Sequence, residues 1–133
     1  MRLITLFLFC LSLSMTAFSH EWGTIDWFDE KMEQLLKLDG NEAEELDVIL
    51  GNTIKSHPTN FLKTVVKYEG KIKRLDSLLA NLGEEFVDQE KKSLEEIEKR
   101  STALKKAISR SRDLELKRVG VRCVSELNKF LKH

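Results

Sequence analysis

Apolar residues recur along most of the chain at steps of three and four residues, which places them on one face of an α-helix. The pattern is clearest in four short stretches of the first half, at residues 25–39, 41–56, 58–69 and 72–82. Alternation of apolar and polar residues, which marks a β-strand, never persists. The pattern therefore predicts an all-α protein.

Glycine, asparagine and proline mark the boundaries between these short helices. Gly40 follows the first stretch and suits the left-handed conformation that ends a helix. Asn41 stands where its side chain can accept from the backbone of Glu44, whose carboxylate completes a capping box. We therefore expect the second helix to open at Asn41. Pro58 disfavours helical geometry at His57 and fits the first turn of a helix, which predicts a third helix from Pro58.

The segment from Phe86 to Ile108 differs from the short helices because its apolar stripe is narrow. Apolar residues follow alternating steps of three and four, but Glu90 and Ser101 interrupt the seam. Opposite charges four residues apart, such as Glu96 and Arg100, are typical of a solvated helix face. We expect a long helix with most of its surface in water.

Two interpretations of this narrow stripe are open. Leu94, Ile97 and Leu104 either pack on the short helices that precede them, or belong to an arm that meets a second copy or a partner. We favour packing in the core. A monomer or a weak homodimer is the expected state.

A break in the apolar rhythm follows the long helix. Residues 109–113 offer helix-capping side chains, which predicts a bend or short break before a last helix from Asp113 to Leu131. Short connections between helices favour antiparallel neighbours. The expected fold is a compact bundle, or stacked antiparallel helix pairs, of about five to six helices after an N-terminal signal peptide.

The signal peptide is predicted at residues 1–19. A basic second residue precedes a mostly apolar run at 3–15, and Ala17 and Ser19 are small residues at the positions that determine cleavage. The run is shorter than the roughly 20 residues that a membrane-spanning helix needs. We expect cleavage after Ser19, a single helical domain at 20–133, and no transmembrane segment after cleavage.

Cleavage leaves one cysteine, Cys123. Small extracellular domains of eukaryotes usually carry an even set of cysteines, so a single thiol favours a bacterial protein, periplasmic or secreted, with a Gram-negative source preferred. Leu116, Cys123 and Leu127 share a helical stripe, which predicts a buried core thiol. A redox-active or dimer-forming cysteine is the alternative.

Charge changes this picture because the two signs are separated along the chain. The chain has 22 basic and 22 acidic residues, a formal net charge of zero, which excludes binding to nucleic acid by bulk charge. Yet residues 20–58 hold 3 basic and 10 acidic side chains, whereas 99–133 hold 11 and 3. We expect the acidic first helices to pack beside the basic last helix and partly neutralise it. The alternative is two separate faces.

Candidate binding residues come from these charges and from two tryptophans. Trp22 and Trp27 lie near the mature N-terminus, off the apolar stripe. Each ring either anchors an interface with a partner or covers the end of the core. The basic C-terminal third supplies seven candidates for contact with anions: Lys105, Lys106, Arg110, Arg112, Lys117, Arg118 and Arg122.

Motifs that carry catalysis are not found in the sequence. It has no Gly-rich phosphate loop, metal-ligand cluster or nucleophile motif, so we expect no enzyme activity, no cofactor and no metal site. A copper site at the new N-terminal His20 would need a second histidine beside it, and His57 and His133 are the only candidates.

By exclusion, the sequence predicts a non-enzymatic periplasmic module that binds another periplasmic or secreted protein, of the inhibitor or immunity type. The alternative is an envelope-associated protein that binds anionic lipid or cell-wall polymer through the basic C-terminal third.

Overall fold

The computed structural model describes residues 20–132, and this part of the chain is all-helical. Residues 1–19, where the signal peptide is predicted, and His133 lie outside the described residues. The elements in chain order are α2 (Ile25–Leu35), α3 (Gly40–Gly51), α4 (Pro58–Tyr68), α5 (Leu75–Ala80), the 3-10 helix η1 (Glu84–Phe86), α6 (Glu90–Arg110) and α7 (Leu114–Leu131). The all-α prediction is confirmed.

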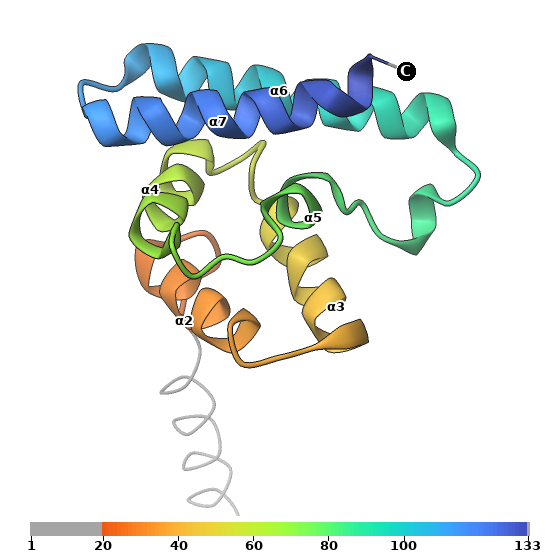
Figure 1. Cartoon of the computed structure of the whole chain (residues 1–133), viewed down its shortest axis with the longest axis horizontal. Helices are drawn as coiled ribbons and strands as arrows, with labels where there is room; N and C mark the ends of the chain where they lie inside the picture. The colour runs from red at the N-terminus through yellow and green to blue at the C-terminus, as the bar shows by residue number, and fades with distance from the viewer. Residues whose placement is uncertain (1–19, 133) are drawn as a thin grey trace, which may run out of the picture.

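The helices form a compact bundle in three tiers. The long helices α6 and α7 lie antiparallel along one side of the molecule (Figure 1). Next to this pair come α4 and α5, which both contact α7, and then α2 and α3, which contact α4 and α5 respectively. The acidic first helices are therefore separated from the basic last helix by the middle tier (Figure 1).

The first two helix boundaries differ from the prediction. Helix α2 ends at Leu35, and Gly40, with a φ of 61°, opens α3 instead of closing α2. Because Gly40 already lies in the helix, Asn41 occupies a helical position, not the extended conformation of an N-cap. The capping box expected at Asn41 and Glu44 is therefore wrong. Helix α3 ends at Gly51, well before Ser56.

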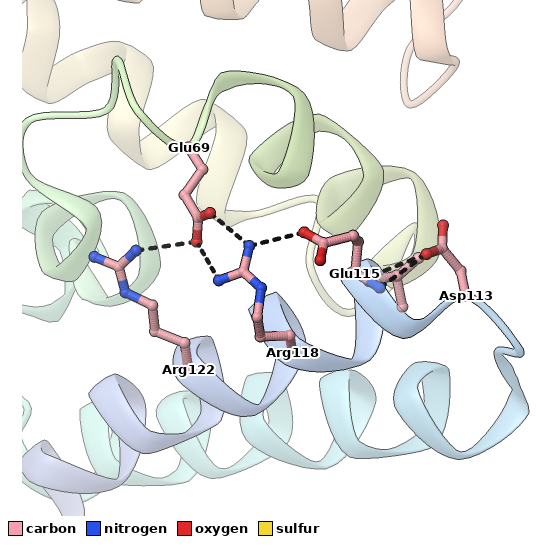
Figure 2. Close-up of polar contacts among 6 residues, drawn as sticks. Glu69, Asp113, Glu115, Arg118 and Arg122 are labelled. Carbon is pink, nitrogen blue, oxygen red and sulfur yellow. Dashed lines mark hydrogen bonds and ion pairs between the residues drawn. The ribbon is translucent and has the colours of Figure 1, made fainter.

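Later boundaries follow the local signals more closely. Helix α4 begins at Pro58, as predicted. Helix α7 begins after a break at 111–113, where Asp113 Oδ1 accepts hydrogen bonds from the backbone of Glu115 and Leu116 at 3.0 and 3.3 Å (Figure 2). Helix α5 is shorter than the predicted 72–82 stretch.

Helix α6 packs in the core and is not an arm. Leu104 is 0% and Ile97 5% exposed, and Leu94 is half-buried. The stripe faces α7 and α4, and Gly120 on α7 permits the close approach. A Cβ at Gly120 would lie 2.5 Å from Cγ1 of Ile108, so a larger residue would require the Ile108 side chain or the helices to shift.

Cys123 is fully buried between the long helices and the middle tier, as predicted. Burial raises the pKa of its thiol to about 12. The thiol is therefore protonated at neutral pH, and the protonated form is a poor nucleophile.

Arg100 is fully buried, so the prediction of a solvated pair with Glu96 is wrong for this residue. Its Nη1 donates to the backbone carbonyl of Leu79 at 2.6 Å, and its Nη2 donates to Oδ1 of Asn52 at 3.0 Å. Glu96 Oε1 lies 3.9 Å from Nε and is paired with Lys55. Arg100 thus joins α6 to the ends of α5 and α3.

The position of Gly51 explains how a guanidinium fits there. A Cβ on Gly51 would lie 2.7 Å from Nη1 of Arg100 and 2.9 Å from the carbonyl oxygen of Leu78. Desolvation lowers the pKa of Arg100 to about 10, and the group still carries its charge at neutral pH. Cations near helix C-termini are favoured by the helix dipole, which suits this location.

Candidate functional site

The two tryptophans take different roles in the structure. Trp27 is 6% exposed and packs edge-on against Phe28, with ring centroids 5.1 Å apart. Trp22 is 49% exposed and rests edge-on against the ring of His57, at 4.8 Å. Trp27 therefore belongs to the core, and Trp22 is the ring that a partner could reach.

A groove lies between the start of α4 and the stretch of α6 from Glu95 to Arg110. Its volume is about 730 Å³. Ser56 and Pro58 line one wall and flank His57, on which Trp22 rests. Lys106 and Arg110 of α6 line the other wall. The fold thus places two of the predicted anion-binding residues across the groove from the start of α4.

The start of α4 adds positive potential to this groove. His57 occupies the N-cap position but its side chain makes no capping hydrogen bond. Within the described residues, the amide N–H groups of Thr59 and Asn60 have no acceptor, and Thr59 lines the groove. The N-terminal turn of a helix carries partial positive charge and unsatisfied donors. An aspartate or glutamate side chain of a partner would satisfy them.

The groove wall on α6 carries both signs of charge. Glu95 and Glu98 line it together with Lys99, and Lys55 on the opposite wall is paired with Glu96. Ala103 and Ala107 provide a small apolar surface between them. The groove is therefore not a uniformly cationic surface.

Two of the seven predicted basic residues are already engaged within the molecule. Arg118 Nη2 lies 2.7 Å from Oε1 of Glu69, and Arg122 Nη1 lies 3.1 Å from Oε2 (Figure 2). Arg118 Nη2 also contacts Glu115 at 3.0 Å. The hydrogen bond from Arg118, helped by Arg122, holds the pKa of Glu69 below its usual value. This cluster joins α7 to the end of α4.

The remaining basic candidates lie outside both the cluster and the groove. Lys105 and Arg112 are exposed, Lys117 is half-buried, and none of the three forms an ion pair with a described residue. The structure therefore divides the seven residues into three groups on different parts of α6 and α7.

The expected neutralisation between the two ends of the chain is wrong. Among the residues of known placement, no ion pair joins an acidic residue of 20–58 to a basic residue of 99–132. Helix α2 contacts α3 and α4, and α3 reaches α6 only at its end, where Arg100 donates to the neutral side chain of Asn52. The molecule has an acidic side and a basic side.

Grouped metal ligands and membrane-spanning helices are both absent from residues 20–132. Over 20–132, no three His, Cys, Asp or Glu side chains are placed to hold a metal ion together. His20 lies 3.8 Å from Glu30, and the ring of His57 contacts Trp22. Over the same range, no helix combines the length and the apolar character needed to cross a bilayer.

Asp47 is a buried acidic residue that was not among the predicted site residues. It is 6% exposed and lines a second cavity, between α3 and the connection from α4 to α5. A signal was present, because Asp47 takes a place on the helical stripe formed by Ala43, Leu50 and Ile54. Burying a carboxylate at a core position of a helix costs desolvation free energy, so an aspartate on this stripe indicates a functional or structural role.

Comparison with known proteins adds no functional assignment. No family model, no curated protein and no solved structure matches this chain.

Proposed function

We propose that this protein is an exported, non-enzymatic module that binds another periplasmic or secreted protein, in the manner of an inhibitor or immunity protein. The partner contributes an acidic segment to the groove between α4 and α6. The observation that carries this proposal is the convergence of an uncapped helix start, Lys106 and Arg110 on one groove. The exposed ring of Trp22 rests on His57, the residue between two lining residues of that groove.

The groove and the exposed Trp22 each have a role in such binding. Trp22 supplies a large, half-exposed ring, the type of residue that dominates interface energetics. Lys106 and Arg110 steer an acidic segment toward the groove and raise the association rate. The N–H groups of Thr59 and Asn60 then donate hydrogen bonds to a carboxylate at the positive end of α4.

A protein partner suits the groove better than an anionic lipid or cell-wall polymer. Glu95 and Glu98 in the lining would repel a uniformly anionic surface, but can pair with basic residues of a folded partner. Arg118 and Arg122, which a membrane would need, are already paired with Glu69. Binding to an anionic envelope component through Lys105, Arg112 and Lys117 remains the competing outcome of the experiment below.

The test is affinity capture from periplasmic extract, followed by mass spectrometry. The bait is the mature protein, compared with a Lys106→Glu/Arg110→Glu variant. Lys91→Glu/Lys92→Glu is the matched control, because it makes the same charge change on exposed residues of the same helix outside the groove. We expect one abundant protein with the wild type and the control, and its loss with the groove variant.

Two results would contradict the proposal. One is a protein captured equally by the wild type and the groove variant. The other is co-purification of anionic lipid or polymer with no protein.

Trp22→Ala then measures the contribution of the Trp22 ring to the binding free energy. For an interface anchor this contribution is about 2 kcal/mol or more, a loss of affinity of about 30-fold.

A further inference from the structure

The second cavity combines an apolar lining with a buried carboxylate, and the proposed function does not involve it. It has a volume of about 370 Å³ and lies between the end of α2, α3 and the connection from α4 to α5. Leu35, Leu36 and Leu38 line it from one side, and Ile72 from the other. Its size falls in the range of about 300–1,000 Å³ that is typical of small-molecule sites.

Asp47 places a buried carboxylate in this apolar cavity. Its Oδ2 accepts a hydrogen bond from Ser77 Oγ at 3.0 Å, and Ser77 Oγ in turn accepts from Nη2 of Arg74 at 3.0 Å. Oδ1 accepts no hydrogen bond from any described residue. Desolvation raises the pKa of Asp47, although Ser77 and Arg74 act in the opposite direction. The carboxylate is therefore only partly satisfied by the protein.

The mouth of the cavity carries both signs of charge on opposite walls. Asp39 and Glu44, both exposed, line the wall that belongs to α3 and the residue before it. Lys71 and Lys73, also exposed, line the wall formed by the α4–α5 connection. A ligand with a single kind of charge would be repelled by one wall, whereas a zwitterion would be attracted by both.

We propose that this cavity binds a small zwitterion with an apolar body: an amino acid with a large aliphatic side chain, or a dipeptide of such residues. The ligand's ammonium group donates to the open oxygen of Asp47, and its carboxylate faces Lys71 and Lys73. Its aliphatic side chain packs against the leucines of the α2 end. This binding is independent of the groove between α4 and α6.

The experiment is isothermal titration calorimetry of the mature protein with leucine and with leucyl-leucine. Binding of either compound supports the proposal, and the tighter one identifies the ligand class. N-acetyl-leucyl-leucine lacks the ammonium group and leucyl-leucine amide lacks the carboxylate, so each should bind at least about tenfold more weakly. No heat with leucine or leucyl-leucine at millimolar concentration, or equal binding of the capped peptides, would overturn the proposal.

Two variants locate the site and separate binding from folding. Asp47→Asn keeps the hydrogen bond with Ser77 but removes the charge, so leucyl-leucine should bind at least about tenfold more weakly. Its melting temperature should be unchanged or higher, because burying the carboxylate disfavours the folded state. Asp76→Asn, an exposed neighbour that does not line the cavity, is the control. Undiminished binding by Asp47→Asn would overturn the proposal.

Ala43→Leu provides a second, independent variant. Ala43 lines the cavity and is half-buried, so a larger side chain occupies the space of the ligand without changing any charge. Loss of leucyl-leucine binding with an intact melting transition supports the assignment. Undiminished binding contradicts it, even if Asp47→Asn does not fold.

Discussion

Replacing Arg100 with Met tests whether the buried guanidinium holds the two parts of the bundle together. The side chain is fully buried and donates hydrogen bonds to the carbonyl of Leu79 and to Asn52. Methionine keeps most of the volume, so the cavity contribution to the free energy of unfolding stays small. The main change is the loss of two charge-assisted hydrogen bonds and of a partner for Glu96.

The expected decrease in the free energy of unfolding follows from these contacts. Each hydrogen bond to a charged group contributes about 1.5–3 kcal/mol, and the two together about 3–6 kcal/mol. Relief of the desolvation that lowers the pKa of Arg100 offsets part of this loss. We expect a net decrease of about 3 kcal/mol in the free energy of unfolding, at the lower end of the values measured for broken buried ion pairs.

The assay is urea denaturation of the mature protein, followed by circular dichroism. A decrease of this size is a large part of the roughly 5–15 kcal/mol that stabilises a typical domain. Lys92→Met, at an exposed position of the same helix, is the control and should change stability by less than about 0.5 kcal/mol. An Arg100→Met protein as stable as the wild type would refute the reasoning, because the guanidinium would then be no better than an apolar residue.

Three further predictions follow from the packing. Gly120→Ala should lower the melting temperature, since the new Cβ would meet Ile108, whereas Gly70→Ala, with open space around the Cβ, should not. Cys123 should resist thiol reagents at pH 8 in the folded protein and react on unfolding, because its pKa is about 12; rapid labelling of native protein would contradict the buried position. The pKa of Glu69 is lowered in the folded state, so the carboxylate stabilises the fold above its unfolded pKa, and this contribution is lost as the pH falls through the folded pKa. Glu69→Gln should therefore weaken the acid dependence of the melting temperature. An unchanged pH profile would argue against the cluster.

Local signals were sufficient for part of the fold. Pro58 and Asp113 act through their own backbone and side-chain preferences, and both helices that follow them begin where predicted. Gly40 has the predicted left-handed conformation, yet it opens α3 instead of closing α2. Which of two neighbouring helices uses such a glycine is decided by packing, which no local pattern contains.

Contacts distant in sequence account for the rest. Glu69 pairs with Arg118 and Arg122, which are 49 and 53 residues away in the sequence. The basic C-terminal third alone therefore could not show that these two arginines are already ion-paired. Arg100 was predicted in water because four-residue spacing to Glu96 is common on exposed helices. Trp22 and Trp27 look alike in the sequence, and only the fold shows which one is buried.

The central claim is that an acidic partner segment lies in the groove between α4 and α6, and hydrogen–deuterium exchange of the captured complex tests it most directly. In the free protein the amides of Thr59 and Asn60 have no acceptor among the described residues and should exchange quickly. The account predicts that both become protected in the complex, together with the exposed segment around Trp22. Protection confined to α2 and α3, with Thr59 and Asn60 still exchanging quickly, would contradict it.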